Sequence, residues 1–413
     1  MGFEWYLDFV DTNHVPENEI ICVFRVEPQD VSMEEAAGRI ASESSVGTWT
    51  TLSSLPERVK KIMAKAYRIE GNRVWISYPL DLFEGGNLPQ LLSSVAGNVF
   101  GMRALKSLRL EDIEFPEDYL KHFKGPAFGI EGVRKKLKIF DRPLTATVPK
   151  PKVGYDAEEY AEVAYESLSG GIDLLKDDEN LTSQPFIRFE KRLERVVKVI
   201  EKVEKETGER KGYLVNITAE AREMERRLKM VAECGNEFVM VDILTAGFSA
   251  LQTVRDLAED HGLAIHAHRA MHGAFTRKPD HGISLRVITK LARIAGVDHM
   301  HVGTGVGKMA GKKEEVKELA EICRGSMGSF KRVFPVSSGG LHPGLIPDVI
   351  ELFGKDVIIQ AGGGVHGHPD GSRAGAKALR DAIDATMEGI PLKDYESPEL
   401  ARALEKWGFV SPK

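Results

Sequence analysis

Residues 170–180 read GGIDLLKDDEN, a short apolar segment that follows a glycine pair and ends in a lysine and three acids. The glycines mark a turn, and the continuous apolar run after them is typical of a strand that is buried on both faces. Lys176 and the acids stand where this strand ends. A solvated ion pair of Lys176 with Asp177 or Asp178 would explain them, and so would a functional site at the strand end.

The same pattern recurs from about residue 125 onward, with segments of helical period between successive strand candidates. Buried parallel strands that are joined by right-handed β-α crossovers close into a barrel more readily than they form an open sheet of this width. We therefore predict a (β/α)₈ TIM barrel domain over residues 125–413. Its eight strands are expected at 144–150, 171–176, 213–218, 238–243, 263–268, 299–304, 332–338 and 357–363.

Residues 1–124 have a different rhythm. Strand, helix, two strands, helix and strand follow in that order, which is the order of a ferredoxin-like α+β domain. We predict this N-terminal domain as a separate unit. Its elements are expected at 19–26, 32–44, 67–80 (a hairpin), 87–97 and 106–115.

The composition of the 413-residue chain is that of an ordinary globular protein, with 56 basic and 62 acidic residues and a formal net charge of −6. Charges of both signs alternate along the helical segments, so neither nucleic acid nor a membrane surface is expected as a partner. Three widely spaced cysteines argue against a disulfide framework and a cysteine-rich metal site. The first residues carry no secretory or myristoylation pattern, and a cytoplasmic protein is expected.

Polar residues and glycines gather at the carboxyl ends of the predicted barrel strands, where barrel enzymes have their active sites. Any one of them alone could be structural. Their joint placement after five or more strands favours a functional site. They are Lys150, Lys152, Lys176, Asp178, Glu179, His268, Arg269, His272, His301, Ser338, Gly339, Gly340, Gly362, Gly363 and Gly364.

The glycines form two groups, after the seventh and eighth predicted strands, where barrels commonly bind phosphate through exposed backbone N–H groups. Arg269 and His301 would add contacts to an anion from the opposite rim. Two phosphate sites suggest a bisphosphate. The glycine-spaced loop 303–311, GTGVGKMAG, carries Lys308 and is either a lid over such a ligand or an exposed turn with a solvated lysine.

The lysine of the opening stretch can take part in a metal site. Lys176 and Asp178 project from one face of the strand because they are two residues apart, and Glu179 can join them beyond its end. Two carboxylates suit Mg²⁺ but leave an octahedral site incomplete, and an ammonium beside them would repel the metal. Addition of CO₂ to the neutral amine would turn Lys176 into a carbamate, which is an anionic oxygen ligand.

These motifs resemble those of the large subunit of ribulose-1,5-bisphosphate carboxylase/oxygenase (RuBisCO), most closely the archaeal form III type, and the resemblance runs from end to end. The resemblance implies a Mg²⁺-dependent lyase, activated by CO₂, that adds CO₂ to ribulose 1,5-bisphosphate through an enediolate and yields two 3-phosphoglycerates. O₂ would be the competing substrate, and the archaeal type implies a role in AMP salvage. The motifs are GGIDLLKDDEN, VPKPKVG, HAHRAMH, GTWTT, GNVFG, HVGTGVGKMAG, SSGG and AGGGVHGHPDG.

The resemblance also implies roles for single residues. Carbamylated Lys176 would hold Mg²⁺ with Asp178 and Glu179, and the carbamate would assist proton abstraction from C3. Lys150, Lys152 and His268 would handle protons. Lys308 would stabilise the carboxylate that forms when CO₂ adds.

The implied substrate-binding residues hold the two phosphates. Arg269, His301 and Ser338 would hold one of them. The residues implied for the other phosphate, together with the adjoining Gly339, are Gly340, Gly362, Gly363, Thr48 and Trp49.

Some of the implied residues belong to the N-terminal domain. The resemblance places Glu43, Thr48, Trp49 and Asn98 over the barrel mouth of a neighbouring subunit, with Glu43 paired to Lys308. It therefore implies a homodimer, or a higher oligomer of dimers, with composite active sites and without a small subunit.

The chain departs from the usual pattern of the family at Leu174, where an aromatic residue is common, and at Val148 and Pro149, where many members have a threonine and a β-branched residue. Two alternatives stay open. One is a RuBisCO-like enolase or isomerase that acts on another phosphorylated keto sugar. The presence of Lys308, His301 and Glu43 favours carboxylation over this alternative. The other is a silent scaffold, which has no physical reason to keep lysine and carboxylates converged at a desolvation cost.

Overall fold

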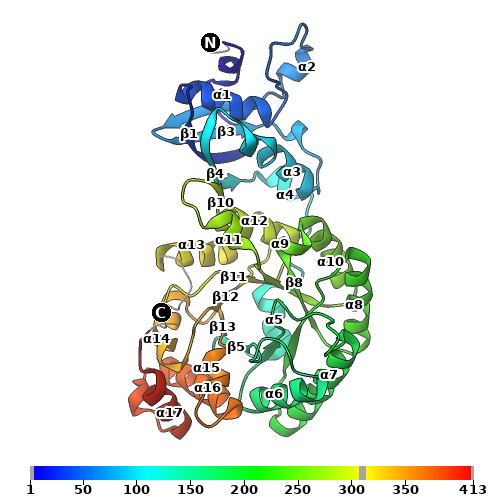
Figure 1. Cartoon of the computed structure of the whole chain (residues 1–413), viewed down its shortest axis with the longest axis vertical. Coiled ribbons are helices and arrows are strands. Elements are labelled where there is room, and N and C mark those ends of the chain that lie inside the picture. The colour runs from blue at the N-terminus through cyan, green and yellow to red at the C-terminus, as the bar shows by residue number, and fades with distance from the viewer. Residues whose placement is uncertain (1–3, 307–312, 411–413) are drawn as a thin grey trace. The chain divides into compact units, whose positions relative to one another are not determined.

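The computed structural model describes residues 4–306 and 313–410. The chain divides into two compact units (Figure 1), one formed by 1–124 with 271–295 and the other by 125–270 with 296–413. Residues 271–295 thus pack with the first unit although they lie between barrel strands in the sequence. The division at residue 125 stays our proposal for the domain boundary along the chain.

The first unit is built on a five-stranded sheet in the order β10-β4-β1-β3-β2. Neighbours among β1 to β4 are antiparallel, which is the ferredoxin-like arrangement and confirms the predicted fold. The added strand β10 runs parallel to β4 and was not predicted, because two residues are too short for a periodic signal. The strands are β1 (Ile20–Pro28), β2 (Lys65–Glu70), β3 (Arg73–Tyr78), β4 (Leu105–Glu114) and β10 (Gly282–Ile283).

Helix α1 shows how the sequence shapes this unit. Ser32 caps its first turn by accepting a hydrogen bond from the backbone N–H of Glu35, and its buried alanines and Ile40 lie on one face. The helices are α1 (Met33–Glu43), α2 (Glu57–Lys60), α3 (Leu88–Val95), α4 (Glu117–Leu120), α11 (His272–Thr276) and α12 (Leu285–Ala295), with 3₁₀ turns at Glu4–Phe9, Leu80–Leu82 and Asn98–Gly101.

The second unit is a closed barrel of eight parallel strands in the order β11-β12-β13-β5-β6-β7-β8-β9, and it confirms the predicted TIM barrel. Several strands are shorter than predicted. Pro149 and Pro151, for example, have no N–H to extend the first one. The strands are β5 (Leu144–Thr147), β6 (Leu174–Lys176), β7 (Gly212–Asn216), β8 (Phe238–Asp242), β9 (Ala264–His268), β11 (His299–His301), β12 (Phe334–Ser338) and β13 (Ile358–Gln360).

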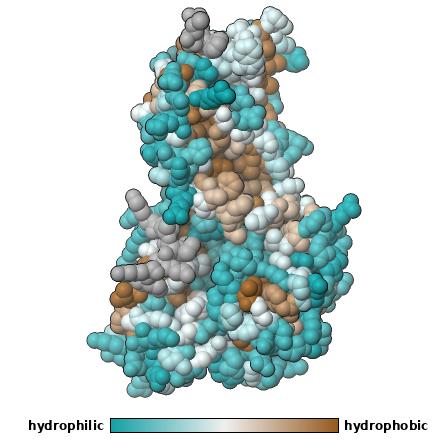
Figure 2. All heavy atoms as spheres, viewed as in Figure 1, coloured by the Kyte–Doolittle hydropathy of each residue, from teal (hydrophilic) through white to brown (hydrophobic). Residues whose placement is uncertain are grey.

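Helices surround this barrel, and the face over α7 and α8 is mostly hydrophilic (Figure 2). None of the helices in the described part of the chain is long and apolar enough to span a membrane. The helices are α5 (Gly129–Leu137), α6 (Ala157–Ser169), α7 (Phe189–Thr207), α8 (Ala221–Glu233), α9 (Ile243–Ala246), α10 (Phe248–Asp260), α13 (Lys313–Arg324), α14 (Ile346–Phe353), α15 (Gly363–His366), α16 (Ser372–Glu388) and α17 (Pro398–Trp407), with 3₁₀ turns at Pro343–Leu345 and Leu392–Asp394.

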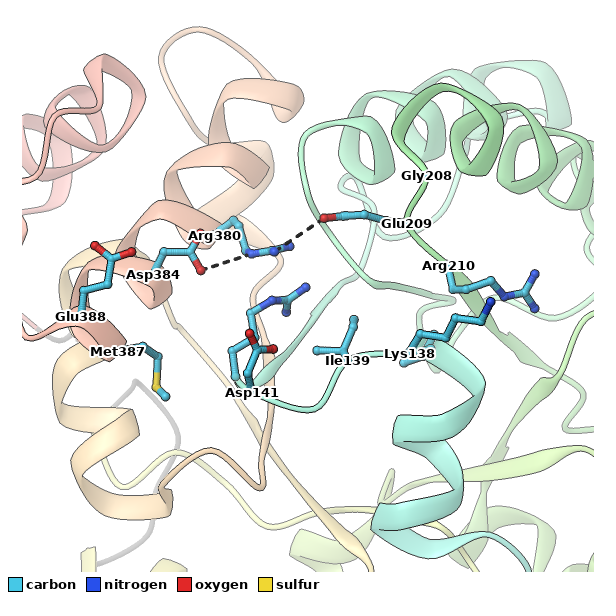
Figure 3. A pocket seen from close by; sticks show the side chains of 12 residues that line it. Lys138, Ile139, Asp141, Gly208, Glu209, Arg210, Arg380, Asp384, Met387 and Glu388 are labelled. Atoms are coloured by element: carbon cyan, nitrogen blue, oxygen red, sulfur yellow. Dashed lines mark hydrogen bonds and ion pairs between the residues drawn. The ribbon is translucent and has the colours of Figure 1, made fainter.

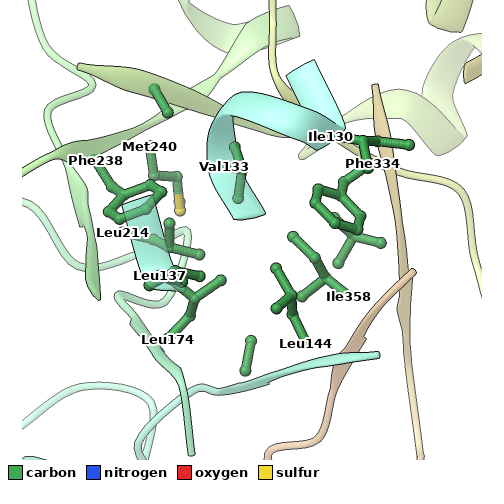
Figure 4. Close-up of a cluster of buried hydrophobic side chains, with 13 residues drawn as sticks. Ile130, Val133, Leu137, Leu144, Leu174, Leu214, Phe238, Met240, Phe334 and Ile358 are labelled. Atoms are coloured by element: carbon green, nitrogen blue, oxygen red, sulfur yellow. The ribbon is translucent and has the colours of Figure 1, made fainter. Parts of the chain in front are cut away.

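The barrel core is apolar at the end where the strands begin. Helix α5 places Ile130, Val133 and Leu137 among the first residues of the strands (Figure 4), including Leu144 and Phe334. This packing closes the amino-terminal end of the barrel with hydrocarbon. The site is therefore expected at the carboxyl end of the barrel, where the charged side chains and glycines of the strand ends gather.

A pocket of about 550 Å³ opens outside that apolar plug, between the loops that precede β5 and β7 and the end of α16. Arg380 lies between Glu209 and Asp384 in it (Figure 3), with N–O distances of 3.6 and 3.4 Å. Its basic residues are matched by as many acids, so its charges balance internally. We assign this pocket a structural role. Arg142, which lines it, forms a buried ion pair with Asp173.

Replacement of Asp173 by asparagine is expected to destabilise the barrel by about 3–5 kcal/mol, because it leaves the guanidinium of Arg142 buried without its counter-ion. Asp173 is fully buried, and Arg142 donates to both of its oxygens over 2.7 and 2.8 Å. Denaturant unfolding of both proteins measures the difference. Glu57→Gln, at the exposed pair with Lys60, is the control and should cost less than about 1 kcal/mol.

The effect of Asp173→Asn should also depend on pH. Burial acts to raise the pKa of Asp173, but the hydrogen bonds and charge of Arg142 outweigh burial and lower that pKa overall. A carboxylate with a depressed pKa stabilises the fold above its unfolded pKa of about 3.9 and loses that contribution as the pH falls through its folded value. The stability gap between the two proteins should therefore be constant near neutrality and shrink below about pH 4. A gap that is already small at pH 7 would contradict the assignment.

Candidate active site

Lys176 is the last residue of β6 and is 1% exposed. Its Nζ donates a hydrogen bond to the backbone carbonyl of Asp177 over 2.8 Å. Burial lowers the pKa of Lys176, while the surrounding carboxylates, Glu179 foremost, act in the opposite direction. The amine is therefore easier to deprotonate than that of a surface lysine, which is the requirement for nucleophilic addition to CO₂.

Asp177 is fully buried, and its carboxylate is turned away from Lys176 into the barrel wall. Its Oδ1 accepts from the hydroxyls of Tyr160 (2.7 Å) and Tyr213 (2.6 Å). Its Oδ2 accepts from Nη2 of Arg192 (3.1 Å) and the backbone N–H of Asn216 (2.9 Å). The simple ion pair of Lys176 with the Asp177 carboxylate is thus excluded, and Asp177 instead fixes the backbone between Lys176 and the next acid.

Asp178 and Glu179 extend from the end of β6 toward two lysines of the loop after β5. Lys150 Nζ lies 2.9 Å from Oδ2 of Asp178, and Lys152 Nζ lies 3.1 Å from Oε1 of Glu179. Burial acts to raise the pKa of Glu179, but hydrogen bonds from its own backbone and from Lys152, with the charge of His268, lower that pKa to about 2. Both lysines and the carboxylates predicted from the strand ends therefore meet in one cluster.

The donor set suits a hard cation only in part. Among residues 4–306 and 313–410, no three His, Cys, Asp or Glu side chains form a group that could hold a metal ion. Asp178 and Glu179 supply carboxylate oxygens beside Lys176, and a carbamate on that lysine would add the missing anionic donor. The residues present thus fit Mg²⁺ if Lys176 is carbamylated.

His268 ends β9 beside this cluster. Its Nδ1 lies 2.7 Å from Oδ1 of Asp242, so Nδ1 carries the proton and Nε2 is the free nitrogen, 3.8 Å from Oε2 of Glu179. The N–H of Ala270 approaches Nδ1 only at 3.3 Å and does not compete with the carboxylate. Burial and the charge of Lys176 lower the pKa of His268 against the effect of Asp242, which favours a neutral imidazole that can accept a proton.

Arg269, His301 and Ser338 form the rim on the adjoining strand ends. Arg269 is 8% exposed, and burial lowers its pKa to about 10, so it stays charged near neutral pH. No carboxylate of the described residues forms an ion pair with it. Nδ1 of His301 lies 2.8 Å from Oγ of Ser338. The charge of Glu315 acts on Arg269 without an ion pair between them. A buried cation in this state, beside these polar groups, is suited to an anionic ligand.

The predicted glycines lie at the ends of β12 and β13. Gly339 and Gly340 have φ values of +117° and +76°, a conformation that favours glycine. A Cβ on Gly362 would lie 3.0 Å from Cε of Lys150, whereas a Cβ on Gly363 would meet no atom within 4 Å. Gly362 thus makes room for a lysine of the site, and the backbone at Gly363 is open on that side.

Four predicted site residues, Glu43, Thr48, Trp49 and Asn98, belong to the first unit. Glu43 and Asn98 line one pocket of about 550 Å³ together with Gly97, Gly101 and Met102. The backbone carbonyl of Thr48 accepts from the indole N–H of Trp5 (3.0 Å), and Trp49 is 72% exposed. Lys308 lies outside the described residues.

Sequence reasoning missed two groups of this site. Asp242 is the last residue of β8 and the last but one of the strand predicted at 238–243, so the strand-end rule would have found it. Asn216 ends β7 two residues before the predicted end of that strand, and it donates through Nδ2 to the carbonyls of Asp178 (3.4 Å) and Glu179 (3.3 Å). Asp177 also stands at a predicted strand end, but its structural role was not predictable because its partners come from three other elements.

Comparison with known proteins gives the same picture over the whole chain. The family model for the catalytic domain of the ribulose bisphosphate carboxylase large chain matches residues 129–407, and the model for its N-terminal domain matches residues 8–119. A ribulose bisphosphate carboxylase of Pyrococcus abyssi is 60% identical over 100% of this chain and 99% of the relative. That of Archaeoglobus fulgidus is 53% identical over 99% of each.

Solved structures agree with these sequence matches. A complex of sulfate ion and octameric RuBisCO from Pyrococcus horikoshii OT3 superposes with a TM-score of 0.96 at 59% identity, covering 99% of this chain and 98% of that one. A dimeric archaeal RuBisCO from Hyperthermus butylicus superposes with a TM-score of 0.93 at 57% identity, covering 98% and 100%.

Proposed function

The chain belongs to the family of ribulose bisphosphate carboxylase large chains, and on that premise we propose that it adds CO₂ to ribulose 1,5-bisphosphate and releases two 3-phosphoglycerates. O₂ is the competing substrate in this proposal. The observation that supports it most is that Asp178 and Glu179 follow the buried Lys176 at the polar end of the barrel, near enough for their charges to act on its pKa.

The metal of the proposal is Mg²⁺, held by Asp178, Glu179 and the carbamate formed when activator CO₂ adds to Lys176. When bound, it would polarise the oxygens of the substrate and stabilise the negative charge that develops on them. Lys150 and Lys152 now neutralise the two carboxylates. They must release these oxygens on activation, which frees both ammonium groups to face the substrate.

Several basic groups of the chain are placed to handle protons. The reaction begins with loss of the C3 proton to give an enediolate, and the carbamate of Lys176 is the proposed acceptor. His268, whose Nδ1 is fixed by Asp242, offers its Nε2 as a further proton acceptor. Lys150 and Lys152 serve as proton donors or acceptors in later steps, and Lys308 stabilises the new carboxylate.

The two phosphates are assigned to two sides of the mouth. Arg269, His301 and Ser338 hold one through charge and hydrogen bonds. The other is bound by backbone N–H groups, to which side chains of a second subunit are added. The proposed residues on that side, with Gly339 adjoining, are Gly340, Gly362, Gly363, Thr48 and Trp49 of the neighbour.

The proposed assembly is a homodimer or an oligomer of dimers without a small subunit. The similar solved structures are described as octameric in one case and dimeric in another. In this arrangement Glu43 pairs with the partner's lid lysine and Asn98 lies near the substrate. A cytoplasmic location and a role in AMP salvage are further parts of the proposal and rest on the sequence resemblance.

The test of the function is to supply ribulose 1,5-bisphosphate with labelled CO₂ and look for labelled 3-phosphoglycerate. Label in this product is the expected result. Proton exchange at C3 without labelled product would instead indicate the enolase or isomerase alternative. Absence of both reactions would indicate a silent scaffold.

Activation is expected to require prior incubation with CO₂ and Mg²⁺ and to become faster as the pH rises. An ordinary lysine with a pKa near 10.4 is neutral in only about one molecule in a thousand near pH 7.4, and each pH unit below the pKa changes that fraction about tenfold. Burial enlarges the fraction for Lys176. The activation rate at constant free CO₂, followed between pH 7 and 8.5, measures this. A full initial rate without prior incubation would refute it.

A further inference from the structure

Three buried imidazoles and one hydroxyl form a continuous hydrogen-bonded row, which we call the histidine row, from His299 at the start of β11 to Ser338 at the end of β12. Nδ1 of His301 lies 2.8 Å from Oγ of Ser338, and its Nε2 lies 2.8 Å from Nε2 of His266. Nδ1 of His266 lies in turn 3.2 Å from Nδ1 of His299. Two of these imidazoles, His266 and His299, take no part in the proposed chemistry.

The three imidazoles are neutral near pH 7. His266 and His299 are 0% exposed and His301 is 2% exposed. Burial lowers the pKa of His299 to about 3, and burial with neighbouring positive groups lowers the pKa of His266 and of His301 well below its ordinary value. A neutral imidazole has one N–H donor and one acceptor nitrogen, so every contact in the row has a direction.

The row therefore has only two consistent settings. In the inward setting the Ser338 hydroxyl donates to His301, which donates to His266, which donates to His299. In the outward setting His299 donates through Nδ1 to His266, His266 donates through Nε2 to His301, and His301 donates through Nδ1 to Oγ of Ser338. Only the outward setting leaves the hydroxyl proton of Ser338 free for another acceptor.

The closed end of the row distinguishes the two settings. Nε2 of His299 has no hydrogen-bond partner among the described residues, and the ring lies between Phe238 and Phe334 at centroid distances of 6.0 Å each. The inward setting would bury an N–H there against hydrocarbon. The outward setting leaves only a lone pair, and orphaned buried N–H groups are the rarer of the two in proteins.

We infer that His299 and His266 are positioning residues that hold His301 as its Nδ1–H tautomer and thereby keep the partly exposed hydroxyl of Ser338 as a hydrogen-bond donor toward the barrel mouth. An anionic ligand at the mouth needs hydrogen-bond donors. Arg269, which follows β9 next to the strand of His301, would supply the positive charge beside this hydroxyl. The consequence for substrate affinity rests on the proposed function. The proton arrangement does not.

Neutron diffraction from deuterated crystals of the wild-type protein without substrate tests the arrangement directly. Deuterium is expected on Nδ1 of His301, Nε2 of His266 and Nδ1 of His299. Deuterium on the three opposite nitrogens, or equal occupancy of both settings, would overturn the inference. This experiment needs no turnover, so its outcome is independent of whether ribulose 1,5-bisphosphate is the substrate.

Kinetics of a double-mutant cycle test the link to the hydroxyl. Ser338→Ala should raise KM for ribulose 1,5-bisphosphate on the order of tenfold, the effect of losing one hydrogen bond to a charged group. His299→Leu should raise KM about threefold or more with Ser338 present but have almost no effect in the Ser338→Ala background. His299→Asn, whose amide can still donate to His266, should restore most of the loss. Equal effects of His299→Leu in both backgrounds would overturn the coupling.

Discussion

Lys176→Ala is expected to abolish CO₂ fixation, by more than about 10³-fold, while the barrel stays folded. The side chain supplies the amine that becomes the proposed carbamate at the end of β6. Its loss also removes a buried positive charge instead of leaving one unpaired, so no large loss of stability follows. Labelled-CO₂ incorporation measures activity, and circular dichroism with thermal unfolding measures the fold.

Lys176→Arg is the matched comparison for this prediction. Arginine keeps the positive charge and most of the length, but its guanidinium does not deprotonate near neutral pH and cannot add CO₂. If the charge alone mattered, Lys176→Arg would keep much of the activity. Inactivity of both variants, with Lys191→Ala as an active control at an exposed ion pair, would identify the amine chemistry as the requirement. CO₂ fixation by Lys176→Arg would exclude the carbamate.

The fold could be predicted because its signals are local. Continuous apolar runs identify each barrel strand, and glycines such as Gly208, which ends α7 with φ +72°, identify helix ends. Leu174, where the chain departs from the usual pattern of the family, lies in the apolar plug of the barrel and not in the site. The apolar run around it was enough to predict this buried position. The strand β10 and the packing of 271–295 with the first unit could not be predicted, because they depend on contacts far apart in the sequence.

The candidate site could likewise be predicted only in part. Which residues stand at strand ends follows from the sequence, and the structure brings Lys150, Lys152, Asp178 and Glu179 together as ion pairs. The direction in which each side chain points does not follow. Asp177 was equivalent to its neighbour in the sequence, yet its carboxylate is turned toward Arg192 on α7, fifteen positions further along the chain. Periodicity ends with the strand, so only tertiary contacts decide such orientations.

Restored activity on mixing two inactive variants, Glu43→Gln and Lys176→Ala, is the second large effect that we expect. In a C₂ dimer with composite sites, a mixed dimer has one site with both defects and one with neither. Its activity should therefore reach at most half that of the wild-type dimer. Random exchange of equal amounts makes half of the dimers mixed, so the whole sample should recover up to about a quarter of wild-type activity.

The structure makes Glu43 a suitable partner in this experiment. It is the last residue of α1, its side chain is exposed within its own unit, and it forms no ion pair with any described residue. Replacement by glutamine keeps its size and removes only charge, so the variant should fold like the wild type, and inactivity must come from a lost contact to another group. Subunits that differ in mass by a tag would prove exchange by native mass spectrometry. If exchange is complete and no activity returns, Glu43 acts within its own chain or has no part in the site.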